Sequence, residues 1–180
     1  MKKILFILGV LTDADMDWLL YVGRREELTL GTVLIAEGSA VDAVYIVLTG
    51  SLKVSIEALA GKEIARLSSG EVVGEISFVD SRPPSATVTA DEETLVLSIP
   101  RQRLMQKLAD DAGFASRFYR AIALSLSDRL RNTVSLLGYG KEVPAHESAK
   151  LNDDLSPIVV EHLPLARSRF ESLLRRLRGY

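Results

Sequence analysis

Residues 70–90, GEVVGEISFVDSRPPSATVTA, contain residue types that suit the binding of a small anionic ligand. Gly74 has no side chain, so the backbone there can approach a ligand closely. The next three residues, 75–77, are expected to begin a helical turn whose free N–H groups attract an anion. The carboxylate of Glu75 would repel a phosphate, so it must bind another atom of the ligand. Arg82 is the only cation in this stretch and the side chain best suited to a phosphate.

Few other residues in the sequence suggest catalysis or metal binding. The chain has no cysteine, which excludes a disulfide framework and a thiolate metal site. Its two histidines, His146 and His162, both lie in the last quarter, which argues against a zinc enzyme and a histidine-based triad. No carboxylate forms a recognisable acid–base pair with a nucleophile. We therefore expect a non-enzymatic protein with no metal site and no required cofactor.

The charges are unevenly distributed along the chain. Residues 1–100 carry eight basic and 15 acidic side chains, a net charge of −7. Residues 101–180 carry 14 basic and nine acidic side chains, a net charge of +5. The first part is a poor surface for nucleic acid, whereas the second could face an acidic partner.

The N-terminal run MKKILFILGVL begins like a signal peptide, with two lysines before apolar residues. However, Asp13, Asp15 and Asp17 follow at once, and no small-residue cleavage site is present. The run is also too short to span a bilayer. We expect a packed segment, no transmembrane span and a cytoplasmic protein.

Short apolar runs separated by glycines predict β structure between residues 24 and 99. The expected strands are near residues 25–29, 32–36, 43–48, 51–57, 63–67, 86–90 and 93–99. This spacing favours a closed antiparallel β-roll of the double-stranded β-helix or jelly-roll type, so the predicted fold class is mainly β with flanking helices. The run AVYIVL should be buried on both faces, whereas the alternating run SLKVSIE should have one face in water.

Helices are expected on both sides of the roll. Thr12 as N-cap and Asp15 as its capping-box partner predict a helix that ends at Gly23. A short helix and a longer one to about Leu137 should follow the roll. The longer helix has an apolar stripe, Ile122, Leu126, Leu130, Val134 and Leu137. A last, arginine-rich helix is expected from Pro164, with an apolar face formed by Ala166, Phe170, Leu173, Leu174 and Leu177.

These elements predict four parts. Residues 1–100 form an N-terminal helix and the β-roll, and residues 101–138 form a hinge with helices suited to dimerisation. A polar linker at residues 139–155 leads to a basic amphipathic helix at residues 156–180.

Three segments in this order, GTVLIAEG, VYIVLTGSLKV and VGEISFVDSRPPSATVTA, resemble the cyclic nucleotide-binding domain of catabolite activators, kinase regulatory subunits and nucleotide-gated channels. The resemblance covers roughly residues 16–137 and implies a β-roll that binds cyclic AMP or cyclic GMP. In that family, the glutamate that matches Glu75 accepts a hydrogen bond from the ribose 2′-hydroxyl, and the matches of Ser85 and Ala86 lie beside the phosphate. The candidate ligand-binding residues are therefore Gly74, Glu75, Ile76, Ser77, Arg82, Ser85 and Ala86.

The sequence departs from the family at the phosphate. The family's phosphate-binding arginine aligns with Pro84, which offers neither charge nor N–H. A charge-assisted hydrogen bond contributes roughly 1.5–3 kcal/mol, so its loss corresponds to roughly 10- to 150-fold lower affinity. Two compensations are open: Arg82 folds back towards the phosphate, or the pocket accepts a different or larger nucleotide. Ser39 is a second departure, because the family usually has an acid or a longer polar residue there.

Two main functional hypotheses remain. The first is a regulatory domain that binds a cyclic nucleotide weakly or noncanonically and relays a conformational change to a protein partner through the C-terminal helix. The alternative is a degenerate, ligand-free domain that acts as a protein-interaction module. Pro84 favours the alternative, whereas Gly74, Glu75 and Ser85 favour the first hypothesis. A DNA-binding transcription regulator is the least favoured, because Pro157 and Pro164 interrupt the only residues left for a helix-turn-helix.

Two helices keep more than one interpretation. The stripe at residues 122–137 either packs on its own roll or pairs with a second copy, and we favour a homodimer. The C-terminal helix either contacts a partner, docks on its own domain or lies on a membrane surface.

Overall fold

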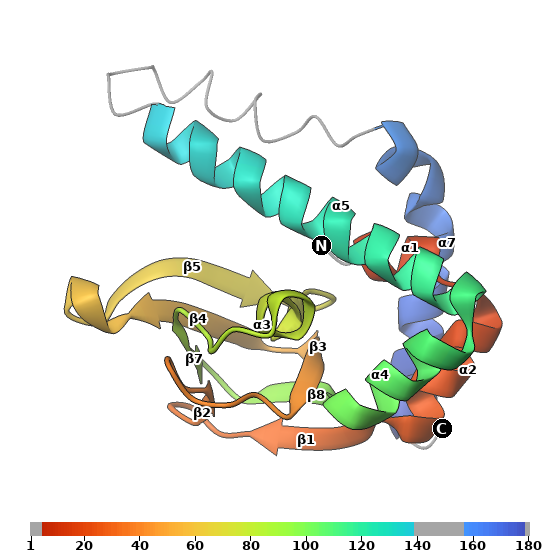
Figure 1. The fold of residues 1–180 in the computed structure, drawn as a ribbon, viewed down its shortest axis with the longest axis horizontal. Helices are drawn as coiled ribbons and strands as arrows, with labels where there is room; N and C mark the ends of the chain where they lie inside the picture. Colours follow the sequence, from red (N-terminus) through yellow and green to blue (C-terminus); the bar gives the residue numbers. More distant parts are fainter. Residues whose placement is uncertain (1–4, 139–156, 179–180) are drawn as a thin grey trace.

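Two antiparallel four-stranded sheets form the β-roll of this protein (Figure 1). The computed structural model describes residues 5–138 and 157–178. The strand order is β1-β8-β3-β6 in one sheet and β2-β7-β4-β5 in the other. The strands are β1 (Arg24–Leu28), β2 (Val33–Ile35), β3 (Ala43–Thr49), β4 (Ser51–Ile56), β5 (Lys62–Ser68), β6 (Val72–Val73), β7 (Thr87–Ala90) and β8 (Thr94–Pro100). The predicted fold class, a mainly β antiparallel roll with flanking helices, is confirmed.

Aliphatic side chains from both sheets fill the interior of the roll. Its buried members are Leu28, Ile35, Val47, Leu52, Leu67, Val73, Val88, Ala90 and Val96. The outer faces of β3 and β8 pack against helices. As its apolar run predicts, β3 is therefore buried on both faces, except at the partly exposed Tyr45 and Thr49. The alternation predicted for β4 is weaker than expected, because only Leu52 of that strand is fully buried.

Helices cover one end and one side of the roll (Figure 1). They are α1 (Leu5–Val10), α2 (Asp13–Val22), α3 (Glu75–Asp80), α4 (Arg101–Asp110), α5 (Ala112–Gly138) and α7 (Pro157–Arg178), with a 3-10 turn at Glu57–Leu59. The predicted linker, residues 139–155, lies outside the described residues.

The predicted capping box at the start of α2 is present. The hydroxyl of Thr12 accepts a hydrogen bond from the N–H of Asp15 at 3.2 Å, and the Asp15 carboxylate accepts one from the N–H of Thr12 at 2.8 Å. Gly23 ends the helix, as expected. The carboxylate of Asp15 also accepts two hydrogen bonds from Arg117 of α5, at 2.6 and 2.9 Å. This buried carboxylate therefore joins α2 to α5.

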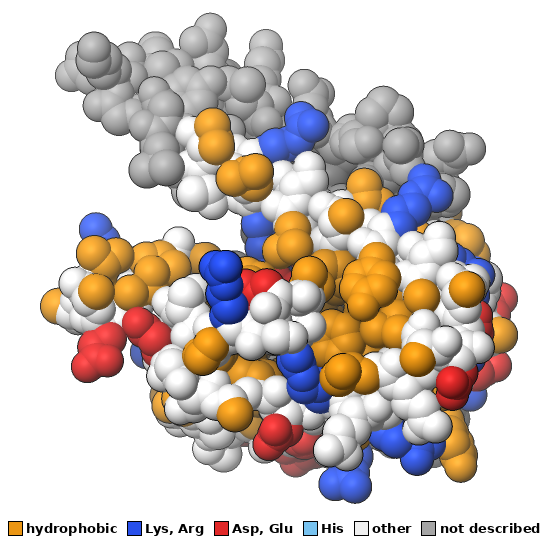
Figure 2. Space-filling model, viewed as in Figure 1, with side chains coloured by type: hydrophobic (Ala, Val, Ile, Leu, Met, Phe, Trp, Pro, Cys, Tyr) orange, Lys and Arg blue, Asp and Glu red, His pale blue; other side chains and the backbone are white. Residues whose placement is uncertain are grey.

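The long helix α5 is buried in its first turns and exposed at Leu130 and Val134. Phe114, Phe118 and Ile122 in its first half are buried in the helical core. In its second half Leu130 is 65% exposed and Val134 is 58% exposed. Figure 2 shows hydrophobic side chains along this helix, above an open space that separates its last described turns from the β4–β5 hairpin. Of the predicted stripe, Ile122 and Leu126 thus pack on the protein's own domain, Leu130 and Val134 are exposed, and the side chain of Leu137 lies outside the described part of the chain.

The last helix, α7, begins at Pro157 and contains Pro164, so the predicted start at Pro164 is wrong. Its predicted apolar face packs on α1 and α2, with Ala166, Phe170 and Leu173 buried. The interpretation that the C-terminal helix docks on its own domain is therefore confirmed. None of the described helices combines the length and hydropathy needed to cross a bilayer.

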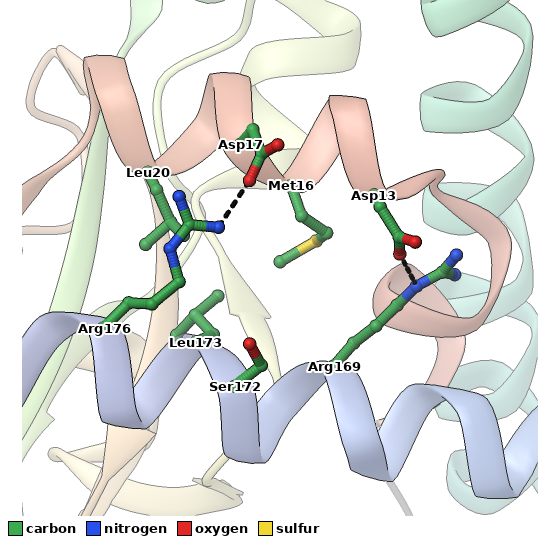
Figure 3. Close-up of a pocket in the computed structure, with 8 residues that line it drawn as sticks. All are labelled: Asp13, Met16, Asp17, Leu20, Arg169, Ser172, Leu173 and Arg176. Atoms are coloured by element: carbon green, nitrogen blue, oxygen red, sulfur yellow. Dashed lines mark hydrogen bonds and ion pairs between the residues drawn. The ribbon is translucent and has the colours of Figure 1, made fainter. Parts of the chain in front are cut away.

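Ion pairs hold α7 beside α2 around a small cavity of about 90 Å³ (Figure 3). The Arg169 guanidinium lies 2.7 Å from the carboxylate of Asp13, and it also donates to the carbonyls of Leu8 and Leu11 at the end of α1. Arg176 pairs with Asp17, one turn further along α2 and two turns further along α7. Arg169 therefore satisfies carbonyls at the end of α1, and both arginines reinforce the apolar contact.

The substitution Phe170→Ala tests whether α7 belongs to the core. Phe170 is 8% exposed, so truncation should lower the free energy of unfolding by about 3 kcal/mol. Leu165, on the same helix, is 45% exposed, and Leu165→Ala should cost about 0.5 kcal/mol. Urea unfolding followed by circular dichroism measures both values. Equal losses would contradict the packing of α7 on the domain.

The pair between Asp15 and Arg117 predicts a pH dependence of stability. Burial raises the pKa of Asp15, but hydrogen bonds from Arg117 and Thr12 outweigh it and lower this pKa from 3.8 to about 2. The ionised carboxylate therefore stabilises the fold above about pH 4, and this contribution, about 2 kcal/mol, is lost as the pH falls towards 2. Urea unfolding at several pH values should show this loss in the wild type and not in Asp15→Asn. The exposed Asp17→Asn serves as control, and a wild-type slope retained in Asp15→Asn would disprove the assignment.

Candidate ligand-binding site

A cavity of about 340 Å³ lies between α3, the loop that follows it, the sheet β2-β7-β4-β5 and α5. All seven residues predicted to bind a ligand line it: Gly74, Glu75, Ile76, Ser77, Arg82, Ser85 and Ala86. The remaining wall is largely aliphatic and is formed by Ile35, Val54, Ala65, Leu67, Val73 and Val88. Two charged residues, Asp80 and Arg129, and two prolines, Pro83 and Pro84, complete it. The volume falls within the range of small-molecule sites, roughly 300–1,000 Å³.

The turn into α3 requires glycine. Gly74 is the N-cap of α3 and has a φ of +84°, in the left-handed region. A Cβ atom there would lie 3.0 Å from the carbonyl oxygen of Ala43. The missing side chain thus allows both the backbone conformation and the close contact with β3.

Glu75 is the most deeply buried polar residue of the cavity wall, with 2% of its surface exposed. Burial raises its pKa, and the charge of Arg129 opposes this rise. One guanidinium nitrogen of Arg129, Nη1, donates to the Glu75 carboxylate, and Nη2 donates to the carbonyl of Val72. A helix that begins 37 residues after Glu75 therefore supplies the cation that a buried carboxylate needs.

Arg129 was not predicted as a site residue. In the sequence it is only a charged neighbour of the apolar stripe on α5, 54 residues away from Glu75. No motif spacing links the two residues. Only the path of α5 across the cavity brings them together.

Two hydrogen bonds from the backbone of Glu37 and Gly38 fix the loop that closes the cavity. The carbonyl of Pro84 accepts a hydrogen bond from the N–H of Gly38 at 2.8 Å, and the hydroxyl of Thr87 accepts one from the N–H of Glu37 at 3.2 Å. Arg82 lines the cavity, but 84% of its side chain is exposed, and its Nε lies 4.0 Å from the Asp80 carboxylate. Its guanidinium therefore sits at the mouth of the cavity, largely in solvent.

Comparisons with known proteins match this part of the chain to one family model. Residues 25–111 match the family model described as cyclic nucleotide-binding domain. The chain is 36% identical over 101 residues to a cGMP-dependent protein kinase of Toxoplasma gondii, covering 56% of this chain and 10% of the kinase. It is 31% identical over 151 residues to the Pycsar effector protein PaPycTIR of Pseudomonas aeruginosa, covering 82% of this chain and 43% of the effector. The chain spans less than half the length of these curated relatives.

Solved structures agree on the fold. A cyclic nucleotide-binding domain from Methylobacillus flagellatus has a TM-score of 0.68 at 21% identity, covering 78% of this chain and 85% of that one. The Thermus thermophilus catabolite activator protein has a TM-score of 0.57 at 23% identity, covering 89% and 87%. These likenesses show the fold, a β-roll with flanking helices. Residues 25–111, which include the cavity loop and α3, are the part of the chain that matches the cyclic nucleotide-binding domain model.

Replacement of Gly74 by alanine tests the geometry of this turn. Gly74→Ala adds strain at positive φ, about 1–2 kcal/mol, and also the contact with Ala43. Gly38 also has a positive φ, but no atom lies within 4 Å of its Cβ position. Gly38→Ala should therefore lower the free energy of unfolding only by the backbone strain. Thermal unfolding should therefore show the larger loss for Gly74→Ala. A smaller loss at Gly74 than at Gly38 would refute the close approach.

Proposed function

We propose that the cavity beside α3 binds a cyclic nucleotide, cyclic AMP or cyclic GMP, and that the domain is a non-enzymatic regulator. The observation that carries this proposal is the single cavity that gathers all seven predicted residues around the buried Glu75. The match of residues 25–111 to the cyclic nucleotide-binding domain model supports it. The aliphatic wall suits a base and a sugar, and the polar end around α3 suits a ring phosphate.

The carboxylate of Glu75 is the proposed acceptor for the ribose 2′-hydroxyl. A carboxylate has two oxygens that accept several hydrogen bonds, so Glu75 can keep Arg129 and still accept a hydroxyl. The phosphate end must bind in a noncanonical way, because Pro84 in the cavity wall provides no side-chain donor. Binding weaker than is usual for the family follows unless another cation compensates.

A relay through α5 is the second part of the proposal. Arg129 ties α5 to the cavity, and the first half of the helix packs on α1, which in turn packs on α7. A ligand that prefers one position of α5 would shift the equilibrium between two states of the helical layer. The exposed Leu130 and Val134 offer a surface for a second copy, and the exposed face of α7 offers one for a protein partner.

One observation favours the alternative, a ligand-free interaction module. In the described structure Glu75 already has a cationic partner from its own chain, and Pro84 replaces the expected arginine. Such a domain would be stable without a nucleotide.

Thermal unfolding with cyclic AMP and cyclic GMP separates the two functions. A ligand at 100 times its Kd stabilises the native state by about 2.7 kcal/mol, so the unfolding temperature should rise. Glu75→Gln removes the charged acceptor and should reduce this rise, whereas Glu93→Gln, at an exposed residue outside the cavity, should leave it unchanged. The 5′-monophosphates serve as noncyclic controls. No rise at millimolar cyclic nucleotide would favour the interaction module.

A further inference from the structure

The proposed ligand presents the site with a charge that must be neutralised. A cyclic nucleotide carries one negative charge on its phosphate, and burial of an unpaired charge is strongly unfavourable. In the loop beside α3, Pro83 and Pro84 do not supply the cation, because neither side chain carries a charge. Among the described residues that line the cavity, the cations are Arg82 and Arg129.

Arg82 is poorly placed for this role. Its side chain is 84% exposed and lies near the carboxylate of Asp80, on its own loop. Charge pairs of such exposed groups contribute little, because water screens them and the long side chain must be ordered.

Arg129 is better placed. Only 26% of its side chain is exposed, so its interactions are less screened than those of Arg82. Its guanidinium has five N–H groups, of which Nη1 serves Glu75 and Nη2 serves Val72. Its Nε is buried and has no hydrogen-bond partner among the described residues. The hydrogen bonds to Glu75 and Val72 use two of the five N–H groups, so this guanidinium has donor capacity that these two partners leave unused.

We propose that Arg129 of α5 is the phosphate-binding cation of this cavity. The guanidinium keeps Glu75 on one side and turns its unused N–H groups to a phosphate oxygen on the other. The sugar and the phosphate would then contact a linked pair, the ribose hydroxyl on Glu75 and the phosphate on Arg129. The charge of the ligand would act directly on α5, which is the element proposed to move. This inference rests on the proposed binding of a cyclic nucleotide.

The test compares affinities for cyclic AMP and cyclic GMP by isothermal titration calorimetry. Arg129→Gln keeps a donor for Glu75 but removes the charge, and it should lower the affinity roughly 10- to 150-fold. Arg131→Ala, at an exposed arginine on the same helix, is the matched control and should bind like the wild type. Arg82→Ala should have an effect well below that of Arg129→Gln.

A rescue experiment separates a phosphate contact from a merely structural role. Pro84 lines the same cavity, so Pro84→Arg in the Arg129→Gln background places a new guanidinium within it and should restore most of the lost affinity. Unfolding curves of each ligand-free variant verify that it is folded. If Arg129→Gln does not fold, the affinities of Arg82→Ala and of Pro84→Arg, each made in the wild type, test the role of Arg129 instead. Pro84→Arg should then bind within a few fold of the wild type, because the phosphate already has its cation.

The outcomes distinguish the two proposals. If the wild type binds neither nucleotide, the proposed function fails and this inference fails with it. If the wild type binds, two results overturn the role of Arg129 alone: unchanged affinity in Arg129→Gln, or a larger loss in Arg82→Ala. A loss that Pro84→Arg does not restore also overturns it, because the role of Arg129 would then be structural.

Discussion

The buried carboxylate of Glu75 requires a cation, and this requirement connects the β-roll to the helices. Gly74 turns the chain so that Glu75 enters the cavity wall rather than solvent. Arg129 is the group that compensates the buried charge, and it reaches the carboxylate from the middle of a 27-residue helix. The removal of one member of such a pair leaves an uncompensated buried charge, so the pair favours the position that α5 has over the roll.

Similar polar contacts fix the rest of the helical layer. Asp15 caps α2 and also binds Arg117 of α5, so the start of α5 is held on α2. Arg169 satisfies carbonyls at the end of α1 and holds α7 in place. The first half of α5 is therefore held in place on α1 and α2, and Arg129 ties the helix to the cavity wall further along.

Local patterns predicted the strands, the capping box and the turn at Gly74 because each depends on neighbours in the sequence. The two-residue strand β6 was missed, since two valines are too short to show a period. The start of α7 was placed at Pro164 because proline favours the first turn of a helix, yet the helix continues through it. Arg129 was missed for a different reason: its role depends on the direction of α5 in space, which no spacing along the chain encodes.

The contact between α7 and the N-terminal helices has a consequence for biosynthesis. Arg169 and Asp13 are 156 residues apart in sequence, whereas the strand pairs of the roll join segments that are much closer. On the ribosome, the roll can assemble while α7 is still untranslated. The side chains of α1 and α2 that face α5 and β8 can then be covered before α7 is made, and the face that contacts α7 is covered last.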